Sequence, residues 1–196
     1  MNQAMARLMK VLPNMLTLLR VVLACLLNYY IFNRFGSLLI PVIIFLLIFL
    51  TDFLDGKIAR FFGSTSHFGA IFDVLADLFY IVISYIVLCS FHVIPVWFFF
   101  IVLFKFIEFV VTSFFLRKLS GGKSIFVFDF IGRFVSVLFY ILPILAYASF
   151  QLSQSLYFFT IHTFIYIIVF MTFVSSSYRF LNCVKVLVRE RNAIPI

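Results

Sequence analysis

Long apolar stretches separated by short polar turns dominate this chain. Gly, Pro, Ser and charged residues divide it into six stretches, at about 14–33, 37–60, 67–91, 94–117, 125–150 and 155–182. Each is close to the roughly 20 apolar residues that a helix needs to cross the hydrocarbon core of a membrane. The pattern therefore predicts an all-α integral membrane protein with six transmembrane helices.

The two ends of the chain are more polar than the six stretches. Residues 1–12 alternate Met5, Leu8 and Leu12 with Arg7 and Lys10, which is typical of a short N-terminal amphipathic helix on the membrane interface. We expect Pro13 to turn the chain inward from there; a frayed tail is the alternative. One membrane domain over 13–183 and a C-terminal tail over 184–196 follow, because no polar stretch between spans is long enough for a separate module.

Composition and charge distribution support this organisation. At 65% hydrophobic and 11% charged residues, the chain has too much apolar surface for a soluble core of its size. Its net charge of +8 comes from basic residues clustered in alternate loops, which places both termini in the cytoplasm of a multi-pass protein of the cytoplasmic membrane. Because these basic residues are divided among separate loops and form no continuous stripe, they argue against a nucleic-acid partner and for contact with anionic membrane lipids. The three isolated cysteines carry no metal or disulfide signal.

Acidic residues are the exception to this apolar pattern. Four of the seven, Asp52, Asp55, Asp73 and Asp77, lie close together in the second and third stretches. Charge at membrane depth costs several kcal/mol unless it is paired, hydrated or bound to metal, so it marks a functional site. The spacings of three and four put each pair on one helix face, and the short turn between the stretches predicts that the two faces meet.

Oxygen-only ligands without His or Cys favour Mg²⁺ or Mn²⁺ over zinc. Four carboxylates can hold two such ions, an arrangement that clamps the oxygens of a transferring phosphoryl group. Neutralisation by Lys57 or Arg60 is the alternative, but it could account for only one of the two pairs. Gly56, Ala59 and Gly69 expose backbone beside the acids, and Arg60 could form a fork with a phosphate.

This spacing resembles the signature of the CDP-alcohol phosphatidyltransferases. The matching positions are Asp52-x2-Asp55-Gly56-x2-Ala59-Arg60-x8-Gly69-x3-Asp73-x3-Asp77, and the opening Leu12-Pro13-Asn14-Met15-Leu16-Thr17-Leu18-Leu19-Arg20 is similar to the family's first span. The resemblance implies transfer of a phosphatidyl group from CDP-diacylglycerol to an alcohol, with release of CMP, two divalent metals and a homodimer.

Residue roles carry over from the resemblance position by position. Asp52, Asp55, Asp73 and Asp77 are expected to bind metal, with Asp77 also the catalytic general base. Contacts with CDP-diacylglycerol are expected from Asn14, Met15, Leu16, Thr17, Gly56, Ala59, Arg60, Ser66 and Gly69.

The acceptor alcohol is less well defined by the sequence. Lys105 and Glu108 form a polar stripe in the fourth stretch that could bind the acceptor or could be an ion pair that neutralises itself. Arg117, Lys118, Lys123 and Arg133 could bind a second phosphate or form the positive cytoplasmic rim.

Within the family, the first span and the GSTSHFGAIFD turn are most similar to phosphatidylglycerophosphate synthases, whose acceptor is glycerol 3-phosphate. Many of those enzymes have Pro and Lys where this chain has Val74 and Leu78, so inositol phosphate or another polyol is the alternative acceptor. A divalent-cation channel or transporter is the non-enzymatic alternative. It would need charges in both halves of the membrane, and Arg34 is the one charge in the external half.

Overall fold

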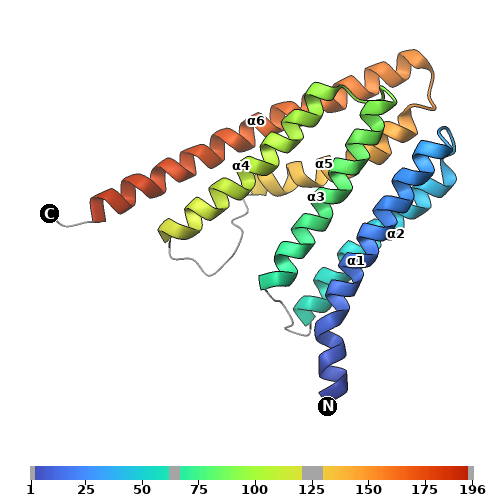
Figure 1. Cartoon of the computed structure of the whole chain (residues 1–196). Coiled ribbons are helices and arrows are strands. Elements are labelled where there is room, and N and C mark those ends of the chain that lie inside the picture. Colours follow the sequence, from blue (N-terminus) through green and yellow to red (C-terminus); the bar gives the residue numbers. More distant parts are fainter. Residues whose placement is uncertain (1–2, 62–66, 121–129, 194–196) are drawn as a thin grey trace. The chain divides into compact units, whose positions relative to one another are not determined.

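The computed structural model describes the backbone of residues 3–61, 67–120 and 130–193, and side chains within 14–54, 68–115 and 130–188 and at Lys57. This part of the chain is all-helical, as predicted. Its helices are α1 (Gln3–Asn33), α2 (Leu39–Phe61), α3 (His67–Ser90), α4 (Val96–Ser120), α5 (Phe130–Ser149) and α6 (Gln154–Ala193) (Figure 1).

Most of these helices are long enough to cross a membrane. Five contain suitable apolar segments, at Asn14–Asn33, Phe68–Ser90, Val96–Phe115, Phe130–Ser149 and Gln154–Val188, and α2 has a shorter one at Leu39–Leu54. At 1.5 Å per residue, the segment in α3 is about 34 Å long, slightly more than the hydrocarbon thickness. The chain is therefore a multi-pass membrane protein.

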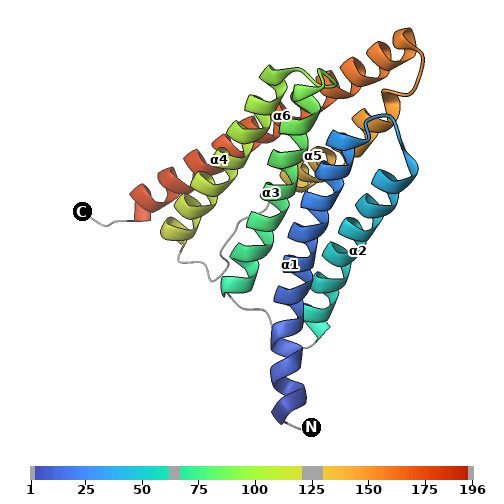
Figure 2. The same cartoon turned by 45° about the vertical axis from the view of Figure 1, so that its right-hand side comes forward.

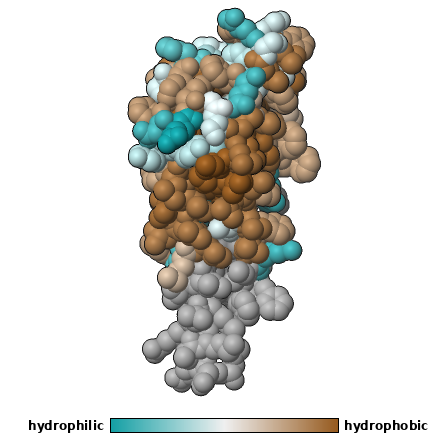
Figure 3. Space-filling model, turned by 90° about the vertical axis from the view of Figure 1, so that its right-hand side faces the viewer, coloured by the Kyte–Doolittle hydropathy of each residue, from teal (hydrophilic) through white to brown (hydrophobic). Residues whose placement is uncertain are grey.

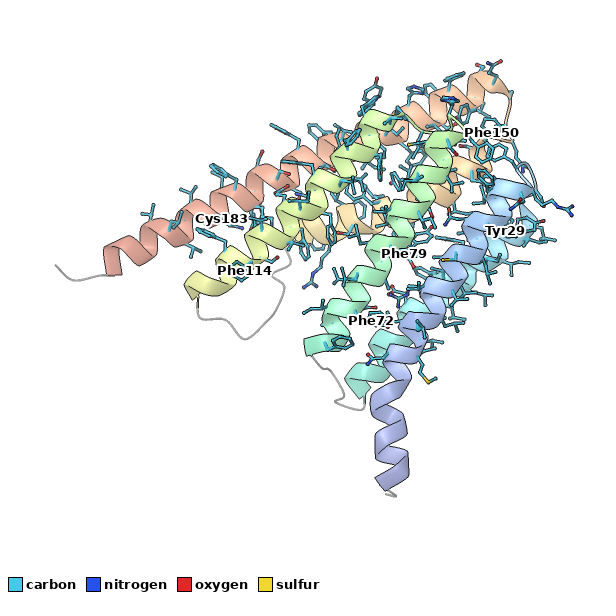
Figure 4. The ribbon with its side chains drawn as sticks, in the orientation of Figure 1. Tyr29, Phe72, Phe79, Phe114, Phe150 and Cys183 are labelled. Atoms are coloured by element: carbon cyan, nitrogen blue, oxygen red, sulfur yellow. The ribbon has the colours of Figure 1, made fainter. Side chains whose placement is uncertain are left out.

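The outward-facing side chains agree with a lipid environment. Phe159 and Phe173 of α6 are 72% and 71% exposed. Tyr29 on α1 and Phe114 on α4, both labelled in Figure 4, are exposed as well. Figure 3 shows hydrophobic residues covering much of one face, with hydrophilic residues gathered toward one end. Soluble monomers rarely expose apolar patches of this extent.

The N-terminal segment differs from the expectation. Residues 3–12 do not form a separate helix, because α1 continues through Pro13 to Asn33. Proline removes one backbone hydrogen bond and crowds the preceding turn, so it can bend a helix without ending it.

By internal contacts the chain divides into two compact units. Unit 1 comprises residues 1–93 and 143–152, and unit 2 comprises 94–142 and 153–196, with the boundary inside α5 at Pro143. In unit 1, α1 packs against both α2 and α3, which lie beside it in Figures 1 and 2. In unit 2, α4 packs along α6.

One face of α1 supplies much of the core of unit 1. Ala24, Leu27, Asn28 and Ile31 are 0–4% exposed, and their spacing of three or four residues places them on one side of the helix. Asn28 Nδ2 donates a hydrogen bond to Ser84 Oγ of α3 at 3.1 Å. This polar contact between buried side chains fixes α3 against α1.

The turn between α1 and α2 is held by the end of α5. Gly36 has a φ of +104°, a conformation that glycine adopts without steric cost. Its N–H donates to the Tyr147 hydroxyl at 3.0 Å, and this hydroxyl donates to the Ser37 carbonyl at 3.0 Å. The turn returns α2 along α1, which brings the acidic residues of α2 to the middle of α1.

Candidate metal centre

Three of the four predicted aspartates come together between α2 and α3. One carboxylate oxygen from each of Asp52, Asp73 and Asp77 lies within 4.8 Å of the others. Their side chains are 36%, 40% and 34% exposed, so the cluster is open on one side. Asp55 also belongs to α2, but its side chain lies outside the described part.

Arg20 of α1 contacts all three acids of this cluster. Its Nη1 is 2.7 Å from Asp73 Oδ1 and 2.8 Å from Asp77 Oδ1, and its Nη2 is 2.9 Å from Asp52 Oδ1. The Arg20 side chain is 0% exposed. One guanidinium therefore joins the acids of two helices from the buried side.

Local helical geometry explains how each group reaches the site. Asp73 and Asp77 are one turn apart on α3, so both face the same neighbour. Thr17, one turn before Arg20, is also buried, and continues the inward face of α1. Asp73 and Asp77 follow Phe68 by five and nine residues, roughly 8 and 14 Å along the axis. The site thus lies at one end of the membrane-spanning segment.

Among the described residues, the basic partner of these acids is Arg20, which the sequence did not suggest for this role. Lys57, considered as a neutralising residue, has its ammonium 4.5 Å from the centre of the Phe53 ring. The contacts of Asp52, Asp73 and Asp77 are with Arg20, and the side chains of Asp55 and Arg60, the other residues of that alternative, lie outside the described part. Since an isolated charge inside a membrane costs several kcal/mol, opposite charges at hydrogen-bond distance offset part of this cost.

The donor set suits a hard divalent cation. Carboxylate oxygens alone, without nitrogen or sulfur, match the preference of Mg²⁺ and Mn²⁺. With all groups ionised, three carboxylates and one guanidinium leave a net charge of −2. The described residues can therefore accommodate a divalent ion without excess charge.

The other residues predicted to contact the nucleotide are only partly described. Thr17 is buried, Met15 is exposed, and Asn14, Leu16 and Gly69 are half-buried, with Gly69 one turn before Asp73. The side chains of Ala59 and Arg60, and the environment of Gly56, lie outside the described part, as does all of Ser66.

The residues considered for the acceptor fall in unit 2 and are partly described. Lys105 Nζ is 3.1 Å from Glu108 Oε2 and 3.0 Å from Ser176 Oγ, and Ser176 Oγ donates to Glu108 Oε2 at 2.6 Å. The structure thus contains the ion pair that was one of the two alternatives. Arg133 is exposed, the side chains of Arg117 and Lys118 lie outside the described part, and so does all of Lys123.

Arg179 extends this polar contact between α4 and α6. It donates to Thr112 Oγ1 and, at 2.8 Å, to Ser113 Oγ, and it lies 4.8 Å from the centre of the Phe109 ring. Its side chain is buried, with 3% of the residue exposed.

Arg20 and Arg179 were missing from the predicted site residues. Each is the one Lys, Arg, Asp or Glu of its predicted stretch, and that isolation is a signal that a charged partner or a special environment is needed. For Arg179, the buried Thr172 and Ser175 repeat at three and four residues and mark the same face.

Fold and site together define a multi-pass helical membrane protein with a cluster of aspartates suited to a divalent cation. The chain belongs to the CDP-alcohol phosphatidyltransferase family, whose sequence model matches residues 10–188. This match covers nearly all of the six helices and confirms the resemblance seen in the aspartate signature. Members of the family are generally metal-dependent.

Individual relatives match shorter segments. The chain is 41% identical over 71 residues to the CDP-diacylglycerol–glycerol-3-phosphate 3-phosphatidyltransferase of Rickettsia typhi, covering 35% of this chain and 39% of the relative. It is 31% identical over 116 residues to the protein of the same name from Cereibacter sphaeroides, covering 58% and 52%. A probable cardiolipin synthase (CMP-forming) of Drosophila melanogaster is 34% identical over 110 residues, covering 56% and 34%. The matches thus span about half or less of these relatives.

Proposed function

We propose that this protein transfers a phosphatidyl group from CDP-diacylglycerol to glycerol 3-phosphate, forming phosphatidylglycerophosphate and releasing CMP. Membership of the family supports the reaction type. The names of the relatives from Rickettsia typhi and Cereibacter sphaeroides support glycerol 3-phosphate as the acceptor.

The observation that carries this proposal is the meeting of Asp52, Asp73 and Asp77 within 4.8 Å. Asp52 belongs to α2, whereas Asp73 and Asp77 are one turn apart on α3, and the packing of the two helices joins them in one oxygen-rich cluster. Together with Asp55 they occupy the positions of the family signature, and we assign all four to two Mg²⁺ or Mn²⁺ ions. When bound, such ions stabilise the charge that develops on the phosphate oxygens.

The acceptor hydroxyl needs a base, and Asp77 is the proposed one. Its carboxylate accepts the hydroxyl proton while the hydroxyl oxygen attacks the phosphorus that carries the diacylglycerol. The bond from this phosphorus to the bridging oxygen breaks, and CMP leaves with that oxygen. Arg20 holds Asp77 at 2.8 Å, so the base is fixed in position on α3 before the acceptor arrives.

Substrate binding is assigned to residues around this cluster. Asn14, Met15, Leu16 and Thr17 of α1 are on the helix that carries Arg20, and we propose that they contact the nucleotide. The same role is proposed for the signature residues Gly56, Ala59, Arg60, Ser66 and Gly69.

The acceptor phosphate is assigned to the basic residues Arg117, Lys118, Lys123 and Arg133, of which Arg133 is exposed. Lys105 is a weaker candidate for this role. Its ammonium is already neutralised by Glu108 at 3.1 Å, and its side chain is 7% exposed. Binding a phosphate there would require the ion pair to separate.

The membrane setting follows from the distribution of basic residues. We propose that the protein lies in the cytoplasmic membrane with both termini in the cytoplasm, because Lys and Arg concentrate in the corresponding loops. The aspartates then face the cytoplasm, where a water-soluble acceptor is available. A homodimer is proposed from the family resemblance, with residues 13–183 as the membrane domain, 1–12 at the interface and 184–196 as a tail.

CMP release by the purified protein tests this function. Protein in lipid nanodiscs is incubated with CDP-diacylglycerol, Mg²⁺ or Mn²⁺, and one acceptor at a time. The acceptors are glycerol 3-phosphate, inositol 1-phosphate, serine and phosphatidylglycerol, the last because a CMP-forming route to cardiolipin would use it. We expect release with glycerol 3-phosphate. Release with another acceptor alone would reassign the substrate, and no release with any acceptor would contradict the proposal.

The same preparation separates the enzyme from a cation channel or transporter. The protein is reconstituted in liposomes that contain a Mn²⁺-sensitive dye, and Mn²⁺ is added outside. If the protein is an enzyme and not a channel, the dye signal stays unchanged. Rapid Mn²⁺ entry without CMP release would favour the alternative.

A further inference from the structure

Arg20 contacts all three described aspartates, yet the sequence signature of the site does not include it. Its Nη1 bridges Asp73 and Asp77 on α3, while Nη2 reaches Asp52 on α2. A planar guanidinium presents several N–H groups in a fixed fork. The positions of the three carboxylates relative to each other are therefore set by one side chain from a third helix.

The two sides of the cluster differ in exposure. Arg20 is 0% exposed, whereas the aspartates are 34–40% exposed. The guanidinium thus approaches from the interior, and the carboxylates reach the surface of the described structure on another side. The three described contacts each engage Oδ1, and an ionised carboxylate offers two oxygens with about four lone-pair sites. A carboxylate can therefore contact Arg20 and a cation together.

Two roles of Arg20 would affect cation binding in opposite directions. If the guanidinium occupied the place of the cation, it would compete, and its removal would tighten cation binding. If it held the carboxylates from behind, its removal would let them separate, because like charges within 4.8 Å repel each other. Full burial favours the second role, since Arg20 would have to leave its interior position to vacate the site.

We propose that Arg20 is a positioning residue of the metal centre, which holds Asp52, Asp73 and Asp77 ready for a divalent cation and stays in place when the cation binds. The inference rests on the proposed metal site. It extends that site to α1, and it makes the buried guanidinium of Arg20 a requirement for binding the divalent metal ion. Groups hydrogen-bonded behind metal ligands typically contribute about 10- to 100-fold in metal affinity.

Mn²⁺ titration of the full chain in nanodiscs, without nucleotide, tests this role. Electron paramagnetic resonance measures free Mn²⁺ as the protein binds it. We expect Arg20→Gln to weaken binding at least about tenfold, and Arg20→Lys to weaken it less, because an ammonium keeps the charge but lacks the fork. Arg34→Gln is the matched control; this exposed arginine follows the other end of α1, and its variant should bind like the unaltered protein.

Whether Mn²⁺ affinity falls or rises in Arg20→Gln decides between the two roles of Arg20. Equal or tighter Mn²⁺ binding by Arg20→Gln, folded as judged by circular dichroism and gel filtration, would overturn the positioning role. If Arg20→Gln does not fold, Arg20→Lys decides alone, and affinity equal to the unaltered protein would overturn the proposal. Absence of Mn²⁺ binding by the unaltered protein would instead contradict the proposed metal site, and this inference would fail with it.

Discussion

The buried pair of Lys105 and Glu108 gives the sharpest stability prediction. The two side chains are 7% and 13% exposed and 3.1 Å apart. Glu108→Gln keeps the size of the side chain and its ability to accept from Ser176, but it removes the negative charge. The Lys105 ammonium then remains buried beside a neutral amide. Loss of one partner of a buried ion pair typically costs about 3–5 kcal/mol, which lowers the ratio of folded to unfolded protein by roughly two to four orders of magnitude.

A double variant separates this charge effect from lost packing. Lys105→Met together with Glu108→Gln removes both charges while an apolar side chain of similar length fills the space. We expect this variant to recover most of the stability lost by Glu108→Gln, because replacing a buried pair by apolar groups is often neutral. The two residues are in contact, so their effects should not add.

Denaturant titration in detergent micelles measures both variants. The chain has one tryptophan, Trp97, near the start of α4, so its fluorescence reports on the helix that carries the pair. Circular dichroism should give the same midpoint. A loss below about 1 kcal/mol for Glu108→Gln, or a double variant no more stable than Glu108→Gln, would refute the reasoning. If the double variant is stable but has a raised KM for the acceptor, the pair also contributes to acceptor binding.

Three further predictions concern the active site and the turn that supports it. Asp77→Asn should lower CMP release by about 10²- to 10⁴-fold, because it removes the general base, while CDP-diacylglycerol binding in a filter assay stays near normal; near-normal turnover would refute the role of Asp77. Removal of divalent cations by a chelator should abolish CMP release, and Mg²⁺ or Mn²⁺ should restore it; turnover that persists in excess chelator would exclude the metal mechanism. Gly36→Ala should lower the free energy of unfolding by about 1 kcal/mol in the same denaturant titration. A Cβ at this position would meet nothing within 4 Å, so the cost comes only from the φ of +104° that alanine disfavours. Unchanged stability would show that the turn relaxes.

The sequence predicted the helices well where they are in contact with lipid. The predicted first stretch ends at the same residue as α1, Asn33, because the polar turn that follows interrupts the apolar pattern. The hydropathy pattern did not predict the outer ends of α1 and α6, since α1 begins at Gln3 and α6 continues to Ala193, past the apolar stretches. Hydropathy indicates which residues suit a lipid environment, whereas backbone hydrogen bonds decide where a helix ends, and these do not depend on apolar side chains.

The sequence predicted those features of the candidate site that depend on local spacing, but it did not predict contacts between residues far apart in the chain. Asp73 and Asp77 share a face through local spacing, which the sequence shows directly. The contact of Arg20 with Asp73 joins residues 53 positions apart, and no local pattern encodes it. The same holds for Arg179, which reaches Ser113 over 66 positions. An isolated charge within an apolar stretch indicates that a partner exists, but only the packing of the helices identifies that partner.

The order of Arg20 and the aspartates along the chain has a consequence for biogenesis. During synthesis α1 enters the membrane before α2 and α3, so its arginine precedes their acids. An aspartate at the centre of a helix opposes insertion by about 2.5–3.5 kcal/mol, and one near the end of the segment, as here, opposes it by less. With Arg20 already in the bilayer, the second and third helices can neutralise part of their charge as they leave the translocon. The residue that organises the finished site would thus also help its acidic helices to enter the membrane.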